Sequence, residues 1–198
     1  MPLVRLAVRA DVDRLSDVLA DAFVGDPLSR WLFGDDGSLR DRLRASFRAI
    51  VRRVYIAKRH TYTTDDVAGG ALWAPPGKWK LSTMQQIRLA PTYMRIVPPS
   101  RLRDGSRLNV VLERAHPAEP HWHLSVLGVD PKRQRTGVGS ALIGPTLERA
   151  DSERTVCYLE TSKEENIPYY ARHGFEVTAE LDMPPGAPRL WTMTRRPQ

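Results

Sequence analysis

Apolar positions recur along the first half of the chain with the two periods that distinguish strands from helices. Apolar residues between 12 and 22 follow Asp11 at helical spacing, and Asp11 suits the N-cap of that helix. We expect the helix to end near Gly25-Asp26-Pro27, because glycine and proline terminate helices. The remaining pattern predicts strands over 3–8, 60–64 and 69–74, and helices over 38–57, 82–96 and 102–115.

The second half alternates strand and helix more regularly. Its pattern predicts strands over 121–129, 155–161, 175–180 and 190–194, and helices over 137–150 and 167–173. Pro145 lies inside the first of these helices and should kink it. A β-α-β-α-β order predicts an α/β protein with helices on both faces of a sheet. The length of 198 residues fits one domain, and the chain contains no internal repeat.

Composition narrows the protein class further. Hydrophobic residues make up 41% of the chain, which argues against disorder, and no apolar run is long enough to span a membrane. Residues 1–9 lack the apolar run of a signal peptide. Cys157 is the only cysteine and lies in an apolar run, so we interpret it as a core residue rather than a nucleophile. We expect a cytoplasmic protein without intrachain disulfides.

The chain is basic, with a net charge of +7. This balance favours polyanionic partners, such as a phosphate-rich cofactor or nucleic acid. Arg40, Arg44, Arg48 and Arg52 lie four residues apart on the predicted helix over 38–57. They could bind an acidic acceptor or nucleic-acid phosphates, but a solvated helix face is the favoured interpretation. Nucleic acid is therefore not an expected partner.

The segment over 129–140 carries the sharpest chemical signal. It lies between an apolar strand and an amphipathic helix, and it contains Gly137 and Gly139 with three basic residues, Lys132, Arg133 and Arg135. Glycines let the backbone approach a ligand closely, and the helix start offers unpaired N–H groups to a pyrophosphate. The pattern is neither a Walker loop nor a dinucleotide fingerprint. By its glycines alone, the segment could also be a plain strand-to-helix turn.

Two motifs together resemble those of the GNAT superfamily of N-acetyltransferases. Gln134-x-x-Gly137-x-Gly139 is similar to its acetyl-CoA signature, and the segment over 166–175 resembles its Asn…Tyr-x-x-x-Gly-Phe block. Stretches over 4–7, 119–120, 128–129, 159–162 and 191–195 are similar in particular to the puromycin N-acetyltransferases. Residues 75–115 match weakly, so the acceptor stays open.

The resemblance implies a fold and a reaction. The fold is a mixed, mostly antiparallel sheet of about six to seven strands, splayed at the cofactor strand, with helices on both faces. Residues 1–198 form one domain, in which 1–115 shape the acceptor pocket and 116–198 bind acetyl-CoA. The reaction is direct acetyl transfer to an amine, and the leading acceptor is the primary amine of a small molecule, such as an antibiotic-like compound. Alternatives are a protein or peptide acceptor, a non-catalytic CoA binder and a basic nucleic-acid-binding protein. Homodimers are common in the family.

The resemblance also implies site residues. The cofactor-binding set is Leu127, Gly128, Val129, Gln134, Arg135, Thr136, Gly137, Val138, Gly139, Ser140 and Asn166. Tyr170 matches the family tyrosine that protonates the leaving thiolate. A phenol can do this because, with a pKa of about 10, it keeps its proton at neutral pH. A simple core aromatic is the alternative for Tyr170, and a helix N-cap is the alternative for Asn166.

The general base is less clear. Glu160 matches the puromycin-enzyme pattern and could act directly or through water, while Glu119 and His123 are rivals. A structural carboxylate is the alternative for Glu160. His121 and His123 would share one strand face, but no further ligand follows at metal spacing, so we predict no metal site. Trp31, Phe33, Trp73 and Trp79 could hold a flat amine, or could simply fill the core.

Overall fold

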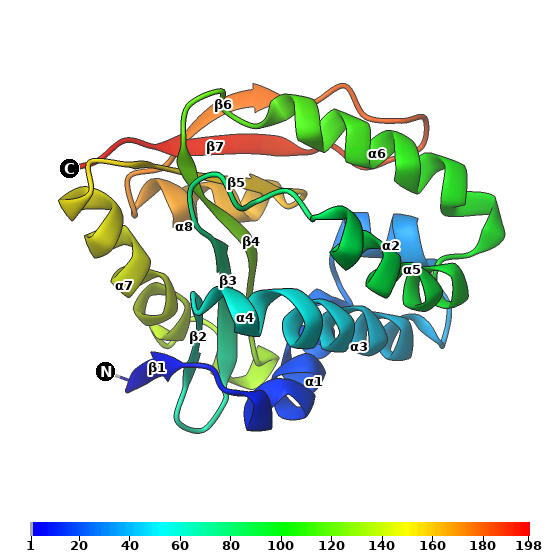
Figure 1. Cartoon of the computed structure of the whole chain (residues 1–198), viewed down its shortest axis with the longest axis horizontal. Helices are drawn as coiled ribbons and strands as arrows, with labels where there is room; N and C mark the ends of the chain where they lie inside the picture. The colour runs from blue at the N-terminus through cyan, green and yellow to red at the C-terminus, as the bar shows by residue number, and fades with distance from the viewer. Residues whose placement is uncertain (1) are drawn as a thin grey trace.

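A mixed seven-stranded sheet organises the computed structural model, which describes residues 2–198 (Figure 1). The strand order is β1-β2-β3-β4-β5-β7-β6, and neighbours are antiparallel except β4 and β5, which run parallel. The strands are β1 (Val4–Leu6), β2 (Thr61–Thr64), β3 (Gly69–Ala74), β4 (His121–Val129), β5 (Val156–Thr161), β6 (Glu176–Glu180) and β7 (Trp191–Arg195). This sheet confirms the predicted fold class, including the number of strands.

Helices cover both faces of the sheet and create two cores. The helices are α1 (Val12–Phe23), α2 (Pro27–Phe33), α3 (Leu39–Ile50), α4 (Ile56–Lys58), α5 (Thr83–Ile96), α6 (Leu102–Ala115), α7 (Val138–Ser152) and α8 (Ile167–Ala171). On one face, Leu15 and Leu43 pack with Leu72 of β3. On the other, Leu142 of α7 packs with Leu159 of β5. Within residues 2–198, no helix is both long and apolar enough to cross a membrane.

The elements differ from the sequence prediction at several places. Gly25-Asp26-Pro27 ends α1 as expected, but it also begins α2, which the pattern did not predict. The Asp26 side chain accepts the N–H of Ser29 at 2.7 Å, and Pro27 occupies the first helical turn. The predicted helix over 38–57 contains a π-helical turn at Val51–Tyr55 between α3 and α4. The first strand is shorter than predicted, and α7 continues through Pro145.

A ladder of three ion pairs joins α1 to α3. Asp13, Asp17 and Asp21 lie four residues apart on α1, and they pair with Arg48, Arg44 and Arg40 of α3 at 2.5, 2.6 and 2.6 Å respectively. The two helices therefore run antiparallel with matched charges at every turn. The arginine side chains stay 39 to 44% exposed, so the face that we expected to be solvated is only partly so, because three of its arginines pair with α1. Their carboxylate partners also leave them less available to nucleic-acid phosphates.

Glycines allow α1 to lie very close to the sheet. A Cβ atom at Gly70 would lie 2.6 Å from Leu15 Cδ1, and one at Gly128 would lie 2.6 Å from Leu19 Cδ2. Leu15 and Leu19 are completely buried, so neither side chain has free space into which to move. The close approach places the end of α1 beside β4.

We therefore predict that Gly70→Ala destabilises the fold by about 1–3 kcal/mol, because the added methyl group overpacks the contact with Leu15. Gly144→Ala is the matched control, since a Cβ there meets no atom within 4 Å. It should stabilise α7 by up to about 1 kcal/mol. Urea unfolding of both variants measures the difference. Equal stability of the two variants would contradict the close packing of α1 on β3.

Candidate active site

The sheet opens between β4 and β5. The two strands pair only from His121 to Leu124 on β4, opposite Val156 to Leu159 on β5. A β-bulge lies immediately beyond, because the β3–β4 register passes from Leu124 to Val126 and leaves Ser125 without a partner. A bulge bends a strand and increases its twist, which gives a physical reason for the divergence. The rest of β4 therefore presents backbone N–H and C=O groups to the gap, where an extended ligand can pair with them.

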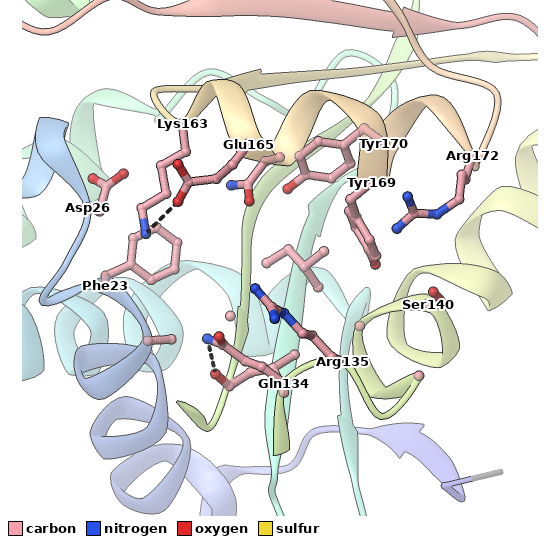
Figure 2. Close-up of a pocket in the computed structure, with 17 residues that line it drawn as sticks. Phe23, Asp26, Gln134, Arg135, Ser140, Lys163, Glu165, Tyr169, Tyr170 and Arg172 are labelled. Carbon is pink, nitrogen blue, oxygen red and sulfur yellow. Dashed lines mark hydrogen bonds and ion pairs between the residues drawn. The ribbon is translucent and has the colours of Figure 1, made fainter. Parts of the chain in front are cut away.

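A pocket of about 580 Å³ occupies this opening (Figure 2). Its size is typical of small-molecule sites. Among the predicted site residues, those that line it are Leu127, Gly128, Val129, Gln134, Arg135, Gly137, Gly139, Ser140, Asn166 and Tyr170. Thr136 and Val138 do not line it: the Thr136 hydroxyl donates to the Arg133 carbonyl, and Val138 is buried in the core on α7. Glu160 also lies outside the lining.

The loop between β4 and α7 forms one wall of the pocket. The side-chain amide of Gln134 donates to the Val129 carbonyl at 3.3 Å and folds the loop back on β4 (Figure 2). Gly137 precedes α7 with φ of +84°, a conformation that suits glycine. A Cβ at Gly139 would lie 2.8 Å from the Tyr169 hydroxyl. The structure therefore requires glycine at both positions of the motif. The unpaired N–H groups at the start of α7 can bind an anion.

Cationic side chains surround this wall. Figure 2 shows the guanidinium groups of Arg135 and Arg172 turned toward the interior of the pocket. Within residues 2–198, neither is paired with a carboxylate. The positive charge of Lys163 is partly compensated, because its Nζ lies 3.9 Å from Glu165 Oε1. The pocket thus offers uncompensated positive charge beside the helix start, an arrangement that suits phosphate groups.

Tyr170 comes to the pocket from α8. It is 8% exposed, and burial raises the pKa of its phenol above the usual value, so the hydroxyl is a proton donor at neutral pH. Asn166 precedes α8, but its side chain does not cap the helix; its Nδ2 donates to Thr161 Oγ1 at 3.4 Å. Asn166 thus occupies the N-cap position of α8 without a capping hydrogen bond from its side chain, and it also lines the pocket.

Glu160 lies at the end of the β4–β5 pairing, next to His123. Its Oε2 accepts the His123 Nε2 proton at 2.9 Å, and its side chain is 13% exposed. Burial acts to raise the pKa of Glu160, but the proximity and hydrogen bond of His123 more than offset it, so the net pKa is lowered. The carboxylate is therefore ionised at neutral pH. Of the two rival bases, His123 contacts Glu160, whereas the Glu119 side chain is exposed.

The structure adds residues that the sequence pattern did not single out. His116 joins His123 and Glu160, and their nearest ligand atoms lie within 4.8 Å of one another, a spacing that could hold a metal ion. The absence of a metal stays a prediction. Phe23 and Asp26 reach the pocket from the end of α1, and no local motif marked them. Arg172 lies inside the motif over 166–175, and its basic side chain is the one sequence feature that could have indicated a role in phosphate binding.

The aromatic residues of the first half divide into two groups. Trp31, Phe33 and Trp73 are at most 7% exposed and belong to the interior. Trp79 stacks on the His116 ring, with centroids 3.6 Å apart and an interplanar angle of 5°. Trp79 therefore contacts the group around Glu160. The Nζ atom of Lys80 lies over the same ring, 5.0 Å from its centroid, as a cation–π contact.

Comparisons with known proteins agree with this architecture. Residues 105–175 match the model of the acetyltransferase (GNAT) family. A Corynebacterium glutamicum structure, described as histone acetyltransferase HPA2 and related acetyltransferase, is 26% identical with a TM-score of 0.72, over 100% of this chain and 97% of that one.

More distant structures share the fold alone. The Drosophila melanogaster polyamine N-acetyltransferase is 12% identical with a TM-score of 0.64, over 99% of this chain and 100% of that one. Arylalkylamine N-acetyltransferase 2 from Aedes aegypti is 14% identical with a TM-score of 0.59, over 99% of each chain. Residues 105–175 are thus similar to the GNAT family of acetyltransferases, and the fold is shared along the whole chain with a structure described as an acetyltransferase.

Proposed function

We propose that the protein is an acetyl-CoA-dependent N-acetyltransferase that acts on the primary amine of a small molecule. The observation that carries the proposal is the unpaired part of β4, which lies in one pocket with the Gly137–Gly139 loop and Tyr170. In this proposal residues 116–198 bind the cofactor and residues 1–115 shape the acceptor side. Two of the similar structures are of enzymes named for small amine substrates, a polyamine and an arylalkylamine, which favours this acceptor class.

The pocket residues fit the parts of acetyl-CoA. The open edge of β4 at Leu127 to Val129 can bond the amide groups of an extended pantetheine arm. The start of α7, with Arg135 and Arg172, can hold the pyrophosphate. When bound, acetyl-CoA supplies an activated acyl group and a thiol leaving group.

The protein's own residues supply orientation and proton transfer. The backbone N–H groups of β4 beside the gap can stabilise negative charge on the acyl oxygen. Tyr170 donates its phenolic proton to the departing sulfur. Glu160, ionised at the end of the β4–β5 pairing, receives the proton of the amine directly or through water.

Thiol release from acetyl-CoA tests the function directly. The purified protein is mixed with a panel of puromycin, polyamines, arylalkylamines and peptides, and free thiol is measured. We expect release with one class of small amines. Release with peptides alone would favour a protein acceptor. If no amine causes thiol release but acetyl-CoA still raises the melting temperature, a non-catalytic CoA binder would be favoured. If acetyl-CoA does not change the melting temperature and the protein binds DNA with an affinity that falls steeply with salt, the nucleic-acid alternative would be favoured.

Replacing Tyr170 tests the proposed acid. Tyr170→Phe removes one hydroxyl from a buried ring, so we expect turnover to fall about 100-fold while the affinity for acetyl-CoA changes little. Tyr62→Phe, on β2 away from the pocket, is the control and should retain full turnover. An unchanged rate in Tyr170→Phe would remove this residue from the mechanism.

Replacing Gly137 tests the placement of the pyrophosphate. Gly137→Glu puts a carboxylate at the start of α7, and we expect a loss of about 3 kcal/mol, or roughly 100-fold, in acetyl-CoA affinity. Gly77→Glu is a matched control, because Gly77 also has a positive φ, +70°, with no atom near its Cβ, and it does not line the pocket. Isothermal titration calorimetry compares them. Normal affinity in Gly137→Glu would refute this placement.

A further inference from the structure

A group of aromatic and ionisable side chains lies at the end of the β4–β5 pairing, outside the lining of the cofactor pocket. This histidine cluster consists of Trp79, His116, His121, His123, Tyr158 and Glu160. Its rings are in direct contact: the His116 centroid lies 3.6 Å from Trp79 and 4.7 Å from Tyr158. The proposed reaction uses only Glu160 of this group, so the other members need a separate explanation.

Hydrogen bonds determine where the protons lie on two of the histidines. His121 Nδ1 is 2.8 Å from the Glu119 carbonyl oxygen, which can only accept, so His121 carries its proton on Nδ1. Burial lowers the pKa of His121, so its Nε2 is an acceptor at neutral pH. His116 Nδ1 lies 2.9 Å from this Nε2 and must therefore donate to it. The remaining nitrogen, His116 Nε2, is left with an unshared lone pair.

This lone pair faces a second acceptor. His116 Nε2 lies 3.6 Å from Glu160 Oε1, which is beyond hydrogen-bonding distance. Burial lowers the pKa of His116 to about 3, so at neutral pH no proton bridges the two atoms. The other carboxylate oxygen, Oε2, already accepts from His123. The cluster thus holds two nearly buried acceptors, His116 Nε2 and Glu160 Oε1, with no proton shared between them.

We propose that His116 Nε2 and Glu160 Oε1 form the binding site for the primary ammonium group of the acceptor. An ammonium group offers three N–H donors and a positive charge, which match the two acceptors and the adjacent ring of Tyr158. The proposal rests on the proposed function for the identity of the ligand as the acceptor. It gives Trp79 of the first half a role as the ring on which His116 stacks.

Proton transfer within this site is balanced. One N–H bond of the ammonium breaks, and its proton passes to Glu160 Oε1. The products are a neutral amine, which has the lone pair that acyl transfer requires, and a protonated Glu160. His116 Nε2 accepts a second N–H of the ammonium and so positions the amine for direct proton transfer to Glu160.

A metal ion is the competing occupant, and the contacts favour the ammonium. A metal held by His116, His123 and Glu160 would have to replace the His123–Glu160 hydrogen bond of 2.9 Å. An ammonium group can contact His116 Nε2 and Glu160 Oε1 and leave that bond in place. It also needs no fixed coordination geometry, whereas structural zinc sites are usually tetrahedral with four ligands.

Nitrogen NMR of the free protein with ¹⁵N-labelled histidine tests the proton positions, independently of any catalysis. We expect the Nδ1–H tautomer for both His116 and His121. Butylammonium chloride should then shift the His116 Nε2 resonance. Two controls separate charge from donor: 1-butanol lacks the charge, tetramethylammonium lacks N–H donors, and neither should reproduce the shift.

Kinetics of variants test the role in acceptor binding. His116→Phe keeps a ring on Trp79 but removes the lone pair, so the KM for the amine should rise at least about 10-fold while the KM for acetyl-CoA stays constant. His116→Gln restores a hydrogen-bond acceptor, so it should recover the amine KM in large part. His60→Phe is the control, since His60 contacts Trp122 and lies outside the histidine cluster.

Four results would overturn the proposal, three from spectroscopy and metal binding and one from kinetics. The first three are a proton on His116 Nε2 in the free protein, equal shifts with butylammonium and 1-butanol, or stoichiometric Zn²⁺ binding that shifts His116 and His123 together. An unchanged amine KM in His116→Phe would do the same. Failure of the proposed function is distinguishable, because it appears as absence of thiol release with every amine, whatever the NMR spectra show.

Discussion

The limited pairing of β4 with β5 is the constraint on which the rest of the site depends. Four residues of β4 pair with β5, and the bulge at Ser125 turns the strand away immediately afterwards. Because the remaining edge cannot be satisfied by β5, its polar groups are available to a ligand. The loop to α7 and the helix α8 lie on the two sides of this gap, as Figure 2 shows. The cofactor pocket is thus a consequence of strand divergence rather than of surface loops.

The first half of the chain supports this opening from one face. The α1–α3 ladder holds the two helices in register, and Gly70 and Gly128 let α1 sit directly on β3 and β4. This close contact brings Phe23 and Asp26 to the pocket. A charged stripe that could suggest polyanion binding serves in the structure to dock two helices. Its function depends on the partner helix, which a single segment of sequence does not reveal.

Features that depend on local sequence could be predicted, and those that depend on distant segments could not. The Gln134–Gly139 loop, the strand before it and Tyr170 follow from neighbouring residues, so their placement in one pocket agrees with the prediction for most of the set. The helix α2 was missed because Asp26 and Pro27 indicate both the end of one helix and the start of the next.

His116 shows the same limit at the site. It ends the α6 segment in a stretch without a motif, and it reaches Glu160 only because β4 and β5 run side by side. The pairing of β4 and β5 is a tertiary feature, so the sequence identified Glu160 and His123 but not the third member of their group. The role of Trp79 was similarly open until its ring was found against His116.

The internal position of the free β4 edge also has a consequence for solubility. Unpaired strand edges usually lie at the margin of a sheet, where a second chain can add a strand and start aggregation. Here the unpaired groups lie within the sheet, with β3 on one side, and β5 and α8 across a pocket of about 580 Å³. A small extended ligand can enter such a gap, but a β-strand from another molecule, with a chain at both ends, is sterically hindered. The fold therefore keeps a backbone recognition edge exposed to its ligand while protecting it from self-association.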